Sequence, residues 1–442
     1  MLVGQLAVMA FGIADTLIAG RYSDAALAAL SVGSAIYVSV FVGLMGILQA
    51  LLPIWAEMLG ARRQEALGRS VRQSLYLCIF IGALGMAVLL FPGSLLRWAQ
   101  VPDSMLDEVQ RYLAVLAFAF VPSLLFRVYS TFNQSLGKPW LVTWLQIVAL
   151  TVKIPLSIWL VAGGGGVDAM GAVGCAWATL VVNCLLLTLA LALLRSQKIY
   201  RPFCLWQRVE RPDWVQIGNF ARLGIPGGLA YLVEMTSFTL MALFISRLGI
   251  VASASHQIAA SVATVLYMIP LSIAMACSAR VSFWLGAARP DYAKRVIIIG
   301  IKLSSLAAIG FAAIIFIVGS LLARGFSVNP EIVSLASTLL VWVAFYHLAD
   351  ALQALCAFML RCYRITLAPL AIYAVLLWGL GLCGGYQLAY EGLAGQPPTQ
   401  SATSFWAASA VAMGLVAISL TGLLWRAVSK SQHARIAPYQ AG

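Results

Sequence analysis

The stretch IAASVATVLYMIPLSIAMACSA, residues 258–279, contains no Asp, Glu, Lys or Arg and lies inside a longer apolar run at 252–280. An α-helix of about 20 such residues is long enough to cross the hydrocarbon core of a bilayer. Continuous apolar runs favour helices over the alternating pattern of barrel strands. Eleven more runs of this kind occur, at 2–20, 26–55, 73–92, 111–135, 139–162, 170–194, 219–246, 296–322, 332–361, 365–390 and 403–427. The sequence therefore predicts an all-α polytopic membrane protein with twelve transmembrane helices.

The composition of the 442-residue chain agrees with this class. Hydrophobic residues make up 62% and charged residues 10% of the chain, whereas a soluble domain has about 45–50% and about 25%. Soluble, secreted and disordered classes are therefore excluded. The first apolar run begins beside Met1 without a basic leader. We expect a transmembrane helix there, with its first turn missing, rather than a cleavable signal peptide.

The net charge of +13 reflects 28 Lys and Arg against 15 Asp and Glu. With both termini placed inside, 21 of the 28 basic residues fall in inner loops, five in outer loops and two within spans. An excess of Lys and Arg in cytoplasmic loops is the ordinary signature of membrane topology. We therefore expect both termini in the cytoplasm, and we expect no nucleic-acid partner.

An internal repeat is visible in the chain. The segment AALAALSVGSAIY at 25–37 is similar to SHQIAASVATVLY at 255–267, an offset of 230, and a basic inner loop follows each segment. Many secondary transporters consist of two such halves, with the substrate site at the repeat interface. We predict two six-helix bundles related by this repeat. The N-terminal bundle covers residues 1–194 and is followed by a cytoplasmic linker at 195–218. The C-terminal bundle covers 219–428, and a cytoplasmic tail follows at 429–442.

Three carboxylates lie inside the predicted spans, whereas the other 12 acidic residues lie in loops or at helix ends. Asp15 is in the first span and Glu234 in the seventh. Asp350 is in the tenth span, four residues after Tyr346 and on the same helix face. A carboxylate in the membrane is costly and usually functional. The set favours binding of H⁺ or of Na⁺ at Glu234 and Asp350, although neutral acids that hydrogen-bond between helices would also fit.

The surroundings of Glu234 predict the charge of the transported molecule. No basic residue lies at helical spacing from Glu234, and Arg361, the last residue of its apolar run, is counted with the inner loops. We therefore predict a carboxylate-rich cavity in this half of the chain, without a competing cation. Such a cavity favours cationic substrates.

Two basic residues, Arg127 and Lys153, also lie within spans. A lysine near a membrane interface can extend its ammonium group to water. The mid-span position of Lys153 instead favours a salt bridge with Asp15, and Arg127 is expected to play a similar part.

Several segments identify a family. ADTLIAG (14–20), LGARRQEA (59–66) and KIPLS (153–157) resemble the first half of the multidrug and toxic compound extrusion (MATE) family, and in particular its NorM-like bacterial subgroup. Three further segments resemble the second half of that family: LGIPGGLAYLVEMTSF (223–238), SHQIAASVATVLYMIPLSIAMACSARV (255–281) and FYHLADALQALCAFMLRCYR (345–364). The resemblance implies a V-shaped pair of six-helix bundles that exports bulky organic cations in exchange for Na⁺ or H⁺.

The same resemblance implies roles for individual residues. Glu234, Tyr346 and Asp350 match the cation site of the family's C-terminal half, and Asp15 matches the acidic residue of its N-terminal half. Relatives tend to have Asn-Ile-Pro-Leu-Asn in the fifth span, where this chain has Lys153 and Ser157. An ammonium fixed beside Asp15 disfavours a second metal cation there by Coulomb repulsion. We therefore expect Lys153 to act as a built-in counter-ion.

The residues and the resemblance together predict a secondary antiporter of the bacterial inner membrane that works by alternating access. The expected partners are small organic cations, Na⁺ or H⁺, and membrane lipid; we expect no cofactor and a monomer. A flippase for lipid-linked saccharides is the nearest alternative, but it would need a basic cluster for pyrophosphate, and only Arg127 and Lys153 are available. An acyl- or glycosyltransferase would need a catalytic cluster in a loop. The short loops contain no such motif, so we expect no enzyme activity.

Overall fold

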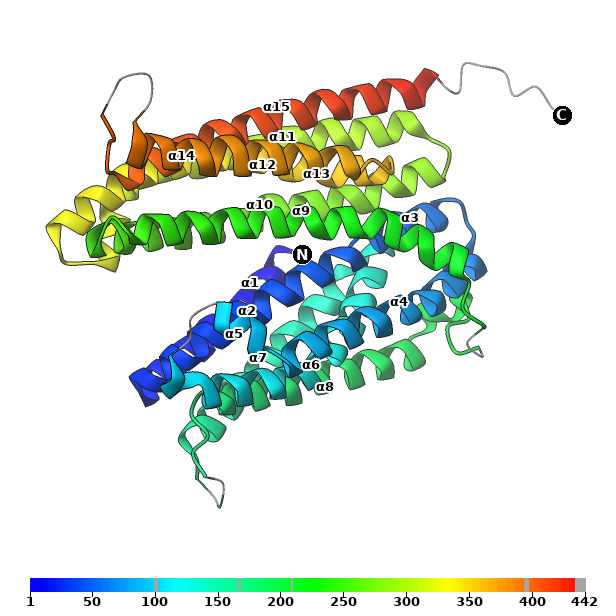
Figure 1. Ribbon diagram of the computed structural model, residues 1–442. Coiled ribbons are helices and arrows are strands. Elements are labelled where there is room, and N and C mark those ends of the chain that lie inside the picture. Colours follow the sequence, from blue (N-terminus) through cyan, green and yellow to red (C-terminus); the bar gives the residue numbers. More distant parts are fainter. Residues whose placement is uncertain (99–101, 165, 167, 208–209, 393–396, 434–442) are drawn as a thin grey trace. The chain divides into compact units, whose positions relative to one another are not determined.

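The computed structural model describes residues 1–98, 102–164, 166, 168–207, 210–392 and 397–433. Within these residues, twelve helical segments are long and apolar enough to cross a membrane, which confirms the predicted fold class (Figure 1). Residues 208–209 of the predicted linker and 434–442 of the predicted tail lie outside the described residues.

The chain divides into two compact units, Met1–Gly228 and Leu229–Gly442. The boundary lies inside one helix, α9, rather than in the predicted linker at 195–218. The helices of the first unit, before α9, are α1 (Leu2–Tyr22), α2 (Asp24–Leu48), α3 (Leu51–Gly60), α4 (Gln64–Leu90), α5 (Gly93–Trp98), α6 (Asp103–Ser135), α7 (Pro139–Ala162), α8 (Ala172–Ser196) and the 3₁₀ helix η1 (Lys198–Phe203). The remaining helices are α9 (Trp214–Ser246), α10 (Ile250–Gly286), α11 (Pro290–Phe326), α12 (Pro330–Cys362), α13 (Leu367–Tyr373), η2 (Ala374–Cys383), α14 (Gly384–Tyr386), η3 (Gln387–Glu391) and α15 (Ala402–His433).

One long helix lies at the centre of each unit. In the first unit α6 packs against α2, α4 and α8, around the fully buried rings of Trp55, Phe120 and Phe132. In the second unit α12 packs against α10, α11 and α15. Both central helices contain 33 residues.

Two predicted spans differ in detail from the structure. The run predicted as one helix at 26–55 is two helices, α2 and α3, which meet at Gln49 and Ala50. Pro53 lies in the first turn of α3, where its missing N–H costs no intrahelical hydrogen bond. The run at 365–390 contains the π-helical segments η2 and η3, a geometry that hydrophobicity alone does not reveal.

The predicted repeat is present in the backbone. The second span, α2 to α3 at 24–60, corresponds in length to α10 at 250–286. Arg62 after α3 and Ala288 after α10 both have a φ of 58°. Likewise Gly137 after α6 and Arg364 after α12 have φ of 71° and 62°. The left-handed residues of the first pair lie 226 positions apart and those of the second pair 227. The structural offset is therefore slightly shorter than the offset of 230 found by comparing the two sequence segments.

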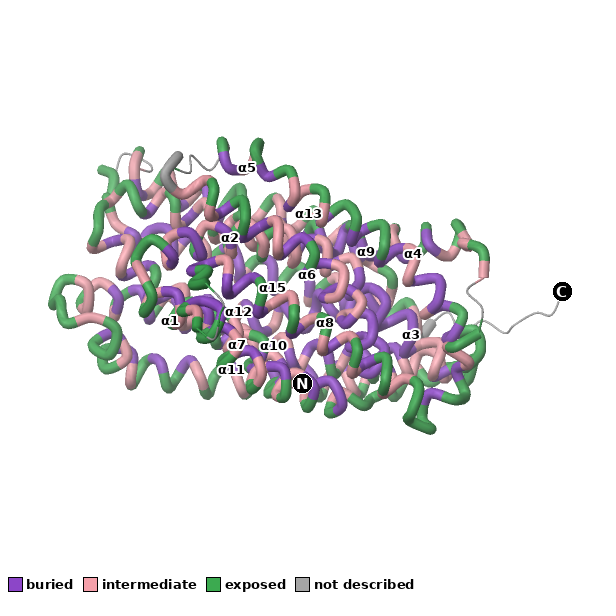
Figure 2. Tube along the Cα trace, turned by 90° about the horizontal axis from the view of Figure 1, so that it is seen from below, coloured by how far each residue is buried: buried purple, intermediate pink, exposed green. Residues whose placement is uncertain are grey.

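The outward faces of the spans are apolar. In α11, Leu306 is 70% and Ile317 is 81% exposed. Figure 2 shows that exposed residues recur along the helices and are not confined to the turns. An apolar face of this kind would be an aggregation liability in water. It is the surface expected of a helix in hydrocarbon.

Glycines allow α9 to begin against α2. A Cβ atom at Gly224 would overlap the carbonyl oxygen of Ile47, and one at Gly228 would lie 2.7 Å from the carbonyl oxygen of Gly43. Small residues four apart let two membrane helices approach with their backbones almost in contact. The first turns of α9 therefore belong to the packing of the first unit.

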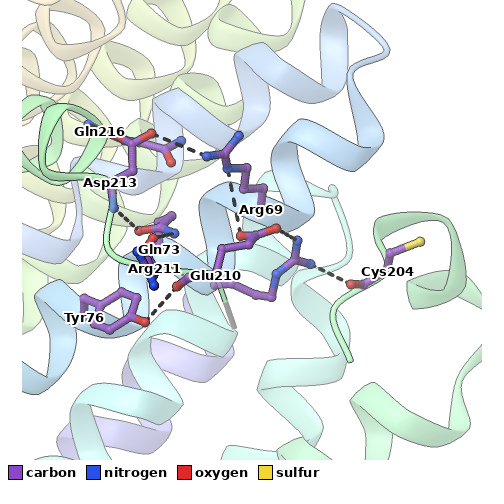
Figure 3. Close-up of polar contacts among 9 residues, drawn as sticks. Arg69, Gln73, Tyr76, Cys204, Glu210, Arg211, Asp213 and Gln216 are labelled. Carbon is purple, nitrogen blue, oxygen red and sulfur yellow. Dashed lines mark hydrogen bonds and ion pairs between the residues drawn. The ribbon is translucent and has the colours of Figure 1, made fainter. Parts of the chain in front are cut away.

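The connection that precedes α9 is held to the side of α4 (Figure 3). The guanidinium of Arg72 donates hydrogen bonds to Glu210 Oε1 at 2.7 Å and to the carbonyl oxygen of Cys204 at 2.6 Å. Tyr76 Oη donates a hydrogen bond to the backbone carbonyl oxygen of Glu210 at 2.8 Å. Arg69 Nε lies 3.9 Å from Oε2 of the Glu210 carboxylate. The hydrogen bond from Arg72 holds the pKa of the Glu210 carboxyl below its ordinary value.

A second group of contacts fixes the start of α9. The side chain of Gln73 accepts a hydrogen bond from the Asp213 amide at 2.8 Å and donates one to the Arg211 carbonyl at 3.0 Å. Asp213 in turn accepts from the Gln216 amide at 3.1 Å, which satisfies one of the amide groups left open at a helix start. The segment that enters α9 is therefore attached to α4 through both side chains and backbone.

Candidate ion-coupling sites

The first unit contains a buried ion pair between α1 and α7. Lys153 Nζ lies 2.9 Å from Asp15 Oδ2, and the two residues are 3% and 8% exposed. The predicted salt bridge is therefore present. The alternative, in which the ammonium extends to water at the membrane interface, is excluded by this burial.

The surroundings of the pair satisfy the ammonium group. Lys153 Nζ donates to Thr179 Oγ1 at 2.6 Å and lies 5.4 Å from the centre of the Phe11 ring. Ser157, one turn after Lys153 on α7, donates to Asp15 Oδ1 at 3.3 Å. The ammonium thus has a carboxylate, a hydroxyl and an aromatic face as neighbours. Together the two charges form a neutral, enclosed cluster.

In the second unit, Glu234 of α9 lies at the border of two small cavities. Each has a volume of about 10 Å³, close to the space that one water molecule needs. The first, cavity A, is lined by Glu234, Ser237, Phe238, Met241, Tyr346, Leu377 and Ser409. The second, cavity B, is lined by Ala230, Tyr231, Glu234, Tyr267, Gln353, Ala354, Ala357, Phe358, Arg361 and Tyr373. Glu234 is the residue that the two linings share.

Asp350 is held next to these cavities by a short chain of hydrogen bonds. It is 3% exposed, and its Oδ1 accepts a hydrogen bond from Gln353 Nε2 at 2.8 Å. The hydroxyl group of Tyr373 donates a hydrogen bond to Gln353 Oε1. Gln353 therefore connects Asp350 to the wall of cavity B. Sequence reasoning missed Gln353 and Tyr373, although Gln353 is a polar residue one turn after an intramembrane aspartate.

Tyr346 was expected to present its phenol together with the Asp350 carboxylate. It lies in the lining of cavity A, with Glu234. Its ring packs edge-on against Phe238 and Trp406, at centroid distances of 5.7 and 6.0 Å. Tyr346 and Asp350 therefore both lie near Glu234, and Gln353 also links Asp350 to cavity B.

The prediction of a cavity without a competing cation is wrong. Arg361, expected in an inner loop, lies in the last turn of α12 and is 8% exposed. It lines cavity B together with Glu234. The apolar run at 332–361 ends at Arg361, which was therefore counted with the inner loop, but the helix continues to Cys362. A boundary drawn by hydrophobicity therefore assigned a buried guanidinium to a loop.

The donor set of the second unit suits a small hard cation or a proton. Two carboxylates, several phenol groups and an amide oxygen lie in or next to cavities A and B, and these are oxygen ligands. Among the residues that the structure describes, no three His, Cys, Asp or Glu side chains gather as they would around a metal ion. An ion in cavity B would therefore depend on Glu234 together with neutral oxygens.

Twelve spans in two repeated units, with a membrane carboxylate at the border of two small cavities, define a membrane transporter. The family model described as MatE matches residues 1–159 and 226–387. The chain therefore belongs to the MatE family, in its NorM-like bacterial subgroup.

Individual relatives agree with this assignment over most of the chain. A protein of Aromatoleum aromaticum named "Probable multidrug resistance protein NorM" is 36% identical over 440 residues, which cover 97% of this chain and 92% of the relative. "Multidrug resistance protein PmpM" of Pseudomonas aeruginosa is 32% identical over 402 residues, which cover 88% and 82%.

Solved structures show the same fold. The eukaryotic MATE transporter AtDTX14 matches with a TM-score of 0.85 at 18% identity, over 98% of this chain and 96% of that one. The Vibrio cholerae MATE transporter VcmN in its bent form matches with a TM-score of 0.84 at 16% identity, over 98% and 95%. At these identities the likeness concerns the fold alone.

Proposed function

We propose that the protein is a secondary antiporter that exports organic cations and drugs in exchange for Na⁺ or H⁺. The observation that carries this proposal is Glu234, a membrane carboxylate at the border of two cavities that oxygen groups line. The relatives named as multidrug resistance proteins support the class of cargo. The protein would act as a monomer in the bacterial inner membrane, with both termini in the cytoplasm.

In the proposed cycle the coupling ion binds at Glu234, with Asp350 as the second carboxylate. Binding neutralises negative charge in the second unit, which favours release of a cationic drug because the two cations compete for the same carboxylates. The protein would alternate between inward-facing and outward-facing states. After the return to the inward-facing state, the coupling ion leaves and a drug cation takes its place, which resets the site.

The first unit would contribute without binding an ion of its own. Asp15 is already neutralised by Lys153, at 2.9 Å. A metal cation beside that ammonium would be repelled. We therefore assign Lys153 the part of an internal counter-ion, and the ion exchange to the second unit.

Ethidium efflux from liposomes tests the proposal, with a Na⁺ gradient and a pH gradient imposed separately. The variants Glu234→Gln and Asp350→Asn should lose gradient-driven efflux. Glu331→Gln is the matched control, because Glu331 is an exposed carboxylate in the first turn of α12. Efflux at the normal rate in both site variants would refute the mechanism. Efflux that neither gradient drives in the unaltered protein would refute the antiport itself.

A further inference from the structure

The guanidinium of Arg361 has no part in the mechanism above, yet it is the cationic group in the lining of cavity B. Its position is fixed by two rings. The guanidinium carbon lies 4.7 Å from the Phe358 ring centre and 5.2 Å from that of Tyr231. Such contacts orient arginine and replace part of its hydration. Because arginine stays protonated in proteins, this is a permanent positive charge.

Cavity B also presents Glu234, so two opposite charges face one small volume. In a poorly hydrated space their attraction is much stronger than at a surface. We propose that Arg361 is a tethered counter-cation for Glu234, with which the coupling ion must compete. This inference rests on the proposed function, in which Glu234 takes part in binding that ion.

The other groups around cavity B leave this part to Arg361. Tyr231, Tyr267 and Tyr373 contribute phenol groups and not acidic or basic side chains of the carboxylate or guanidinium kind. Asp350, the remaining charged group on the adjoining face of α12, already accepts a hydrogen bond from Gln353. Within the lining of cavity B, Glu234 and Arg361 are therefore the residues with acidic and basic side chains.

A simpler role is available for any arginine in the last turn of a helix. A positive charge there interacts favourably with the helix dipole and with the last carbonyl groups. That role predicts lower stability when Arg361 is replaced, but no change in ion affinity. The counter-cation role predicts tighter ion binding when the charge is removed, since the ion then has no competitor.

The experiment measures gradient-driven ethidium efflux in liposomes against Na⁺ concentration and against pH. Arg361→Gln should lower the half-saturating Na⁺ concentration by about tenfold, or raise the pH of half-activation by about one unit if protons are the coupling ion. Arg361→Lys should stay close to the unaltered protein. Arg324→Gln is the matched control, because Arg324 is the basic residue in the last turn of α11 and is exposed.

Thermal unfolding in detergent supplies a second readout. Glu234→Gln removes the carboxylate that Arg361 faces across cavity B and should lower the midpoint. The double variant Glu234→Gln/Arg361→Gln should recover part of the loss. If Arg361→Gln alone does not accumulate, its accumulation in the double variant would support the pairing. Failure of both forms to accumulate would show a purely structural role.

The two proposals fail in different ways. Unchanged ion dependence in Arg361→Gln, with efflux still abolished by Glu234→Gln, would overturn the counter-cation role and leave the antiport mechanism intact. Ion-driven efflux that survives Glu234→Gln would instead overturn the proposed function on which the inference rests.

Discussion

Removal of the Lys153 ammonium, by Lys153→Met, should be among the more destabilising single substitutions in the first unit. Lys153 is 3% exposed and lies 2.9 Å from Asp15 and 2.6 Å from Thr179. After the substitution the Asp15 carboxylate would keep the Ser157 hydroxyl as a donor but lose its only ion-pair partner among the described residues. The carboxylate would then be enclosed, charged and poorly compensated.

The expected loss of unfolding free energy follows from the removal of only one of the two paired charges. Breaking a buried ion pair by removing one partner costs about 3–5 kcal/mol, whereas a polar contact between membrane helices is worth about 0.6 kcal/mol on average. Because the residual charge dominates, we expect a loss of about 3 kcal/mol for Lys153→Met. Replacing both charges, in Asp15→Asn/Lys153→Met, removes the unpaired group and should return stability to within about 1 kcal/mol of the unaltered protein.

The assay is reversible unfolding in mixed detergent micelles, read as the free energy of unfolding for the unaltered protein, both single variants and the double variant. Ser157→Ala is the control for loss of one hydrogen-bond donor without loss of a charge, and it should cost about 1 kcal/mol. A double variant as unstable as the sum of the two single variants would show that the charges are not coupled. That result would refute the reasoning, because the expected recovery depends entirely on mutual compensation.

Two further predictions concern the segment that enters α9. The pKa of Glu210 is lowered first by its hydrogen bond from Arg72. This hydrogen bond therefore stabilises the segment fully at a pH above the ordinary carboxyl pKa, and the stabilisation is lost as the pH falls through the lowered pKa. Hydrogen exchange of the segment should rise on acidification in the unaltered protein but show no such step in Glu210→Gln. Gly68→Ala should destabilise the first unit by about 1–3 kcal/mol, because its Cβ would overlap the Phe203 carbonyl oxygen. Gly218→Ala, whose Cβ meets nothing within 4 Å, is the control, and equal unfolding free energies for the two alanine variants would contradict the close approach.

The architecture was predictable because one physical requirement dominates it. A backbone in lipid must satisfy its own hydrogen bonds, so each apolar run long enough to cross a bilayer forms a helical span. The ion pair of Asp15 and Lys153 was predictable for a related reason. Two opposite charges among apolar residues of the same half have few stable arrangements other than contact with each other.

Arg361 shows where this reasoning stops. Hydropathy locates the apolar run, but a helix ends where its backbone and packing end it. Here α12 continues to Cys362, and rings from α9 and from α12 itself receive the guanidinium. Likewise the contact of Arg72 with Glu210 joins residues 138 positions apart. No periodicity in the sequence marks such a pair, since it forms only when the connection packs against α4.

The repeat separates what the two units share from what they do not. The central helices α6 and α12 correspond at a displacement of 227 residues from first to last residue, 103 to 330 and 135 to 362. At that displacement Asp350 corresponds to Ser123, which donates a hydrogen bond to its own helix. Arg361 corresponds to Gln134, which donates to Ser130.

The charges proposed for ion coupling on α12 therefore have neutral counterparts on α6. The buried charges of the first unit that pair directly come instead from α1 and α7. Backbone, turns and helix lengths are common to both units, whereas the intramembrane charges belong to each unit separately. A substitution of one of these charges consequently has no equivalent charge in the other unit, so the proposed ion coupling is tested on variants of the second unit.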